Sequence, residues 1–157
     1  MQPEVVASNL VFMLPNATLY HFGILTSTIH NAWMRYTCGR LKSDYRYSNT
    51  IVYNNFPWPS VTPADKAAAA IDAAAQAILD ARALYPESSL ADLYDPLSMP
   101  PELVKAHAAL DKAVDAAYSY KSGKDDAARV AFLFGRYQQL TSLLPAATTK
   151  KSRKRST

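Results

Sequence analysis

The sequence predicts a mainly α-helical protein, a bundle of about four helices with a short N-terminal β remnant and a disordered basic tail. Apolar residues recur every three to four positions in four separate segments, which is the pattern of amphipathic helices. Proline and short polar stretches separate these segments. The chain of 157 residues is 49% hydrophobic and 19% charged, which is ordinary for a folded domain long enough to bury a core.

The first third of the chain mixes the two kinds of element. Residues 8–14 form a short apolar run of strand length that ends at Pro15. Residues 18–38 predict a helix, because apolar side chains recur on one face at Phe22, Leu25, Ile29, Trp33 and Tyr36. Residues 40–49 are polar and irregular and predict an exposed loop. Residues 50–53 are β-branched and aromatic and predict a second short strand.

Three further helices are predicted after residue 60. The first spans 63–84, with Thr62 as its N-cap and Pro63 at its first position. The others span about 98–120 and 125–144, each with an apolar stripe. Their connections are short, so we expect the three helices to pack as an antiparallel bundle or against the helix at 18–38.

The composition changes along the chain and predicts three regions: residues 1–60, a helical region at 61–145, and a disordered tail at 146–157. Phe56, Pro57, Trp58 and Pro59 lie at the first boundary, where we expect them to form a structural junction. The net charge of +4 divides unevenly, since the first 60 residues carry four basic and two acidic side chains and the last eight residues carry five basic ones. The basicity therefore belongs mainly to the tail, which predicts weak, salt-sensitive attraction to phosphates.

Nothing in the sequence predicts a catalytic or metal site. His21, His30 and His107 occur with the single Cys38, and their spacing matches no metal-binding motif. One cysteine also excludes an internal disulfide framework and favours a reducing, cytoplasmic location. The N-terminus lacks the pattern of a secretory signal, and no apolar run is long enough to span a membrane.

The segment Asn54-Asn55-Phe56-Pro57-Trp58-Pro59 resembles in composition the Asn-Pro-Pro-aromatic element with which amino-methyltransferases hold a flipped base. The order of residues differs, because that element needs the asparagine directly before two prolines. No glycine-rich cofactor loop precedes the segment either. We therefore interpret it as structural.

Residues 40–49 are the stretch that most resembles a nucleic-acid contact surface. Arginine and lysine can neutralise phosphates, while tyrosine, serine and asparagine can bond to backbone oxygens or base edges. A solvated loop whose tyrosines pack back onto the preceding helix is the alternative interpretation. The candidate DNA-contacting residues are Arg40, Lys42, Arg46, Tyr47, Ser48 and Asn49.

Several unusual short sequence segments indicate a family resemblance: FGILTS, HNAW, YRYSN, NNFPWP, LYDPL and MPPEL. Together they make residues 8–144 resemble the C-terminal end of MmeI-like DNA methyltransferases, which are single-chain restriction-modification enzymes. Those enzymes carry an adenine-specific methyltransferase core, a target-recognition domain and a small helical C-terminal domain. The resemblance implies that residues 1–60 end the target-recognition domain and that residues 61–145 form the helical domain.

The resemblance implies a non-catalytic C-terminal fragment that contributes to DNA positioning and domain packing. Its expected partners are double-stranded DNA and the methyltransferase core that this chain lacks. S-adenosylmethionine is expected in that core, and this chain is expected to bind no cofactor itself. Two alternatives are a free-standing helical protein-interaction module and an accessory subunit of a separately encoded methyltransferase.

Overall fold

The structure is a computed structural model that describes residues 11–62 and 64–142. These residues form a mainly helical fold with one small antiparallel hairpin, in agreement with the predicted fold class. No helix among them is long and apolar enough to cross a membrane. The elements in order are α1 (Leu19–Thr26), α2 (Thr28–Thr37), β1 (Gly39–Leu41), β2 (Asp44–Arg46), the π-helix η1 (Asn49–Tyr53), α3 (Lys66–Ala83), α4 (Leu90–Leu93), α5 (Pro101–Ala117) and α6 (Asp126–Thr141).

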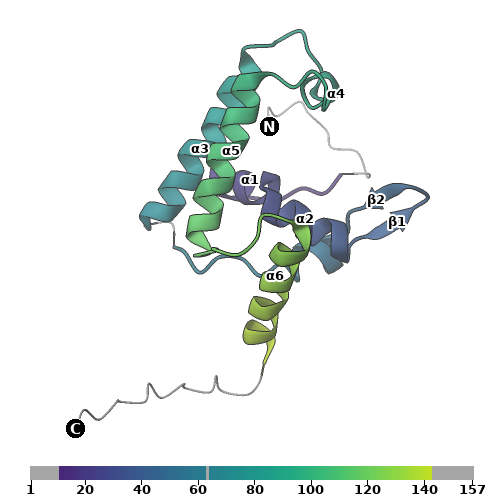
Figure 1. Cartoon of the computed structure of the whole chain (residues 1–157), viewed down its shortest axis with the longest axis vertical. Coiled ribbons are helices and arrows are strands. Elements are labelled where there is room, and N and C mark those ends of the chain that lie inside the picture. The colour runs from purple at the N-terminus through teal and green to yellow at the C-terminus, as the bar shows by residue number, and fades with distance from the viewer. Residues whose placement is uncertain (1–10, 63, 143–157) are drawn as a thin grey trace.

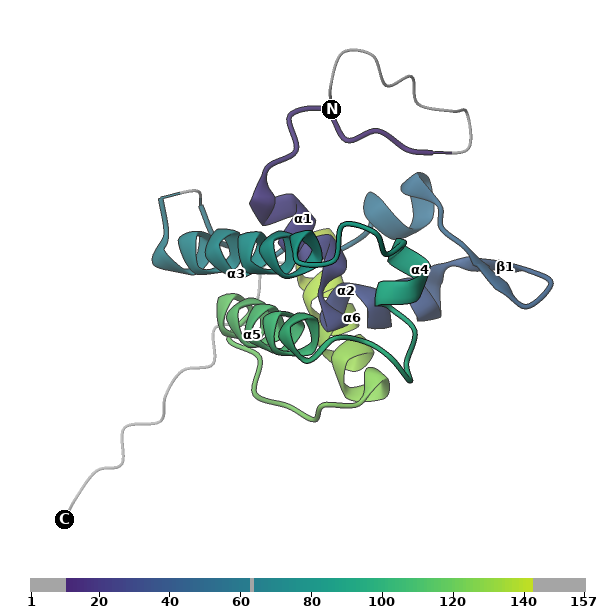
Figure 2. The same ribbon diagram turned by 90° about the horizontal axis from the view of Figure 1, so that it is seen from above.

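The two longest helices, α3 and α5, lie side by side and run antiparallel, joined by a loop that contains α4 (Figures 1 and 2). Helix α1 packs against α3, and α2 continues from α1 toward the hairpin. Helix α6 packs against α2. Of the two predicted arrangements, the structure therefore has the one in which the later helices pack with the first helical segment.

The predicted helix at 18–38 is wrong in one respect, because Ser27 divides it into α1 and α2. Ser27 has an extended backbone, with φ −68° and ψ 156°. Its hydroxyl donates to the carbonyl of Ile24 at 2.6 Å and accepts the N–H of His30 at 3.4 Å. A serine side chain that bonds to neighbouring backbone groups replaces the helical ladder at this point. Tyr36, predicted on the buried face with Ile29 and Trp33, is 59% exposed near the end of α2, whereas the other two are buried.

Both predicted strands are also wrong within the described residues. Residues 11–14 form no strand, and Phe12 is 63% exposed there; residues 8–10 lie outside the described part. Residues 50–53 belong to η1, because the Ser48 hydroxyl accepts the N–H of Ile51 at 3.3 Å and caps the turn. Local side-chain caps outweigh the β propensity of this short apolar run.

The later helices begin and end slightly inside their predicted limits. Helix α3 begins at Lys66, with Asp65 as its N-cap, and the Asp65 carboxylate accepts the N–H of Thr62 at 2.6 Å. Pro63 lies outside the described residues. Helix α5 ends before Ser119, whose left-handed φ of 54° is incompatible with a continued helix. The predicted end of the last helix and the predicted disordered tail at 146–157 fall beyond residue 142.

One hydrophobic core joins the two regions on either side of residue 60. Trp33 of α2 is 2% exposed, and its indole N–H donates to the carbonyl of Val52 at 3.0 Å. Arg129 of α6 is 4% exposed and forms a bidentate ion pair with Asp115 of α5. The largest buried apolar side chains come from both regions: Ile24, Ile29, Trp33, Ile71, Ile78, Leu103, Leu110 and Leu133.

Gly23 allows α1 to approach α3 and α5 closely. A Cβ atom at this position would lie 2.7 Å from Cγ2 of Ile71 and 3.1 Å from Cδ1 of Leu110.

We expect Gly23→Ala to lower the free energy of unfolding by about 1–3 kcal/mol through overpacking, measured by denaturant titration. Gly135→Ala, in the middle of α6, is the matched control, because a Cβ atom at that position meets nothing within 4 Å. It should raise stability by about 0.5–1 kcal/mol, and equal stability of the two variants would contradict the close crossing.

Burial of His30 makes stability depend on pH. His30 is 2% exposed, and burial lowers its pKa to about 4. In the unfolded chain the imidazole of His30 binds a proton near pH 6.5, whereas in the folded chain it stays neutral until about pH 4. The free energy of unfolding is therefore highest above pH 6.5 and falls as the pH drops toward 4. We expect a loss of about 3 kcal/mol from this residue. Urea titrations between pH 4 and 8 should show a shallower pH dependence for His30→Phe; the same slope in both proteins would contradict the prediction.

Candidate nucleic-acid interface

The region predicted as an irregular loop is a β-hairpin that projects from the helices (Figure 1). Strands β1 and β2 pair antiparallel, with Arg40 opposite Tyr45. Lys42 and Ser43 form the turn, and Lys42 has the left-handed φ of 57° that two-residue hairpin turns require. Every residue of both strands is exposed. The stretch is therefore an ordered ribbon whose side chains face solvent on both sides.

The hairpin carries more positive than negative charge. The guanidinium of Arg40 lies 4.3 Å from the centre of the Tyr45 ring and donates to its hydroxyl at 3.2 Å. Lys42 at the tip and Arg46 on β2 make no ion pair with any described residue. Asp44 is the single acidic side chain of the ribbon. These cations are accessible and free of carboxylate partners, which is what a contact with phosphates requires.

The other three predicted contact residues connect the hairpin to the fold. The hydroxyl of Tyr47 lies 3.1 Å from Nε2 of His30, and burial raises the pKa of Tyr47 to about 12, so this phenol stays neutral. Ser48 caps η1, and Asn49 accepts the N–H of Thr50 at 2.8 Å. Tyr47 and Ser48 are half-buried, whereas Asn49 is exposed. DNA contact by all six residues stays a prediction.

The contact between His30 and Tyr47 ties the hairpin to α2. The His30 ring also packs edge-on against Phe56, with ring centres 4.5 Å apart. Both titratable groups of the pair are neutral near pH 7, so the link is a hydrogen bond rather than an ion pair. Sequence reasoning placed His30 outside any metal motif but found no role for it. The alternative interpretation, in which the tyrosines pack back onto the preceding helix, is confirmed for Tyr47. No local signal indicated His30 as its partner, because the two residues are 17 positions apart.

A groove of about 900 Å³ lies beside the hairpin, between α2, η1 and the segment before α1. Its lining includes polar groups suited to hydrogen bonding with a ligand and apolar groups suited to packing against one. No three His, Cys, Asp or Glu side chains of the described residues gather in a way that could hold a metal ion. The residues that combine these properties in the groove are Met13, His30, Asn31, Arg46, Asn49 and Asn54.

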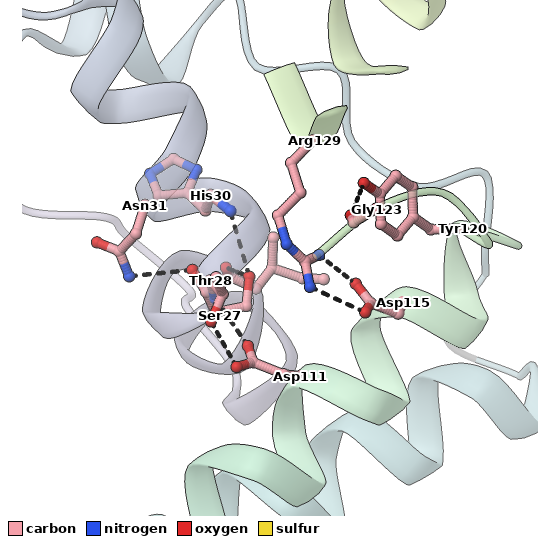
Figure 3. Close-up of polar contacts among 10 residues, drawn as sticks. Ser27, Thr28, His30, Asn31, Asp111, Asp115, Tyr120, Gly123 and Arg129 are labelled. Atoms are coloured by element: carbon pink, nitrogen blue, oxygen red, sulfur yellow. Dashed lines mark hydrogen bonds and ion pairs between the residues drawn. The ribbon is translucent and has the colours of Figure 1, made fainter. Parts of the chain in front are cut away.

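Helix α2 is held at both ends by the helices that follow residue 60. At its start, Asp111 of α5 accepts the backbone N–H of Thr28 at 2.7 Å and the Thr28 hydroxyl at 2.5 Å (Figure 3). In its last turn, Arg35 donates two hydrogen bonds to Asp126 of α6, at 2.6 and 2.9 Å. The bond to Arg35 lowers the pKa of the Asp126 carboxyl. The helix that carries the hairpin is therefore positioned by α5 and α6.

The proline-aromatic segment packs against the same two helices. The hydroxyl of Tyr118 donates to the carbonyl of Pro57 at 3.0 Å, and Arg136 donates to the carbonyl of Trp58 at 3.2 Å. Phe56 is 4% exposed and packs edge-on against Tyr118. The carbonyls of Pro57 and Trp58 are thus satisfied by side chains from the end of α5 and from α6, as a structural junction requires.

Two family matches meet near residue 60. Residues 1–60 match the family described as MmeI, target recognition domain, and residues 62–145 match the family described as MmeI, C-terminal domain. DNA methyltransferase A of Bacillus subtilis (strain 168) is 40% identical over 138 residues, which are 88% of this chain and 15% of that protein.

A solved structure of the type IIL restriction-modification enzyme MmeI in complex with DNA is 56% identical and superimposes with a TM-score of 0.78. The match covers 82% of this chain and 17% of that chain. This chain therefore spans less than a fifth of the length of each of these relatives. By both domain matches and by sequence identity, it belongs to the MmeI family of restriction-modification DNA methyltransferases.

Proposed function

We propose that this chain is a non-catalytic part of an adenine-specific DNA methyltransferase and helps to place double-stranded DNA for the methyltransferase core. The observation that carries the proposal is the exposed hairpin with Arg40, Lys42 and Arg46, held beside a groove. The DNA complex of the MmeI relative supports it. The placement role is the same whether the core is joined to this chain or is a separate subunit.

The shape and charge of the hairpin suit duplex DNA. A two-stranded β-ribbon is narrow enough to enter the major groove, which is about 12 Å wide. Arg40 and Tyr45 project from one face of the ribbon and Arg46 from the other, while Lys42 lies at the tip. A ribbon inserted edge-on would place cations near both phosphate backbones, and the neighbouring Asn49 offers an amide to a base edge or to a sugar.

Methyl transfer is assigned to residues outside this chain. Family membership implies S-adenosylmethionine, which methyltransferases bind at a glycine-rich turn between a strand and a helix. In the described residues the β-structure is the two-stranded hairpin, and Gly23 is packed inside a helix crossing. The residues present do not fit a site for this cofactor, so we propose that the core binds it.

Removing the hairpin cations should weaken DNA binding and its dependence on salt. Replacing Arg40, Lys42 and Arg46 together by Gln is expected to lower the slope of log K against log salt concentration by about 3, because each lost phosphate contact removes about 0.9. Fluorescence anisotropy with a DNA duplex, in chains that lack residues 150–155, measures this without the tail. The control replaces Lys105, Lys112 and Lys121 by Gln and removes the same charge. Equal losses in both triple variants would exclude a specific role for the hairpin.

The contact between Arg35 and Asp126 allows a test in which electrostatics and positioning predict opposite signs. Asp126→Asn removes a negative charge, which alone should strengthen binding to DNA. If α6 positions α2 and its hairpin, the variant should instead bind DNA several-fold more weakly. Asp80→Asn, on the exposed side of α3, removes the same charge far from α2 and serves as control. Stronger binding by both variants would show that the ion pair does not position the hairpin.

A further inference from the structure

A second hollow, of about 460 Å³, lies where the break between α1 and α2 meets α3, α5 and the α4 loop. It shares Leu25 and Asn31 with the groove beside the hairpin, so the two hollows are adjacent along this break. Neither the predicted DNA-contacting residues nor the proposed function makes use of it. Its polar lining consists mainly of Thr26, Thr28, Arg82, Tyr94, His107 and Asp111.

Arg82 brings a positive charge to this hollow without a carboxylate partner. The ion pairs of the described residues are Arg35 with Asp126 and Arg129 with Asp115. The half-buried guanidinium of Arg82 instead donates from Nε and Nη2 to the hydroxyl of Tyr94, at 3.1 and 2.6 Å. The guanidinium also lies over the rings of Phe22 and Tyr94, 5.4 and 5.1 Å from their centres. A cation whose partners are a phenol hydroxyl and two aromatic rings, and no carboxylate, retains the capacity to bind an anion.

Asp111 brings a negative charge to the same hollow, and its carboxylate is bonded to Thr28 and not to Arg82. Asp111 directs both carboxylate oxygens to Thr28, one to its backbone N–H and one to its hydroxyl. Figure 3 shows this carboxylate turned toward the start of α2. Asp111 therefore serves as a cap of α2, and it makes no ion pair with Arg82.

The hydrogen bonds around Tyr94 determine which groups remain as donors. The Tyr94 oxygen accepts two bonds from Arg82, so its own proton goes to Nε2 of His107, 2.6 Å away. His107 is then neutral and carries its proton on Nδ1, in agreement with the burial that lowers its pKa. Nη1 of Arg82, Nδ1 of His107 and the hydroxyl of Thr26 donate to no other described residue. The lining thus offers three free donors, of which one is cationic.

We propose that this hollow binds a backbone phosphate of the same duplex DNA that the hairpin contacts. Arg82 supplies the charge, and the ring N–H of His107 and the Thr26 hydroxyl supply neutral donors. The inference rests on the proposed DNA-placing function and extends it from the hairpin to the helices after residue 60. A phosphate contact here positions DNA without reading its sequence.

Three substitutions separate a phosphate contact from a merely structural role of Arg82. Arg82→Gln removes the charge and is expected to raise the Kd for duplex DNA roughly three- to tenfold and to lower the salt slope by about 1. Arg82→Lys restores the charge and should recover the slope. Lys121→Gln, at an exposed position after α5, is the charge-matched control.

The measurement is fluorescence anisotropy with duplexes of two unrelated sequences, on variants whose circular dichroism matches that of the unmodified chain. Equal weakening by Arg82→Gln and Arg82→Lys would assign Arg82 to the packing of α4, because restoring the charge would then restore no binding, and would overturn the proposal. An Arg82→Gln variant that behaves like Lys121→Gln would overturn it as well, while weakening by the hairpin variants would leave the proposed function standing. Failure of the unmodified chain to bind either duplex at low salt would instead reject the proposed function. If millimolar inorganic phosphate shifts the NMR signals of His107 while DNA affinity is insensitive to Arg82→Gln, the hollow is a small-anion site.

Discussion

The positioning of α2 by two carboxylates is the constraint on which the rest of this structure depends. Asp111 caps the start of the helix and Asp126 pairs with Arg35 in its last turn. Between these two points Trp33 is buried in the shared core and bonded to the carbonyl of Val52. A helix held at both ends and along its buried face has a defined orientation. The hairpin follows directly after α2, so the orientation of α2 also determines the orientation of the hairpin.

The two segments of the chain that match different domain families share one hydrophobic core. The family boundary falls at residues 60–62, yet the buried side chains of α1 and α2 pack against those of α3, α5 and α6. The turn at Phe56 to Pro59 carries the chain across this boundary, and the carbonyls of Pro57 and Trp58 accept hydrogen bonds from Tyr118 and Arg136. The hairpin is thus supported from behind by the C-terminal helices, and in the proposed function these helices position the hairpin without supplying chemistry.

The sequence predicted the helices better than the short elements between them. Stripes of apolar residues such as Ile71, Ile78 and Leu110 repeat with the helical period over many residues, so α3, α5 and α6 were expected nearly where they are. The hairpin was predicted as a loop, and η1 as a strand. Such elements of three to five residues carry too few positions for a period to show, and a single cap such as Ser48 decides the form of η1.

The sequence by itself determined the helical class, the basic character of residues 40–46 and, through a few unusual short segments, the family. These properties depend on residue type and local spacing, which any reader of the chain can count. Only the tertiary structure decided that Tyr47 meets His30, that Asp111 and Asp126 hold α2, and that Arg82 lies in a hollow beside the groove. Each of these contacts joins residues that are distant in the chain, and their partners are selected by how the apolar faces pack, which local pattern does not record.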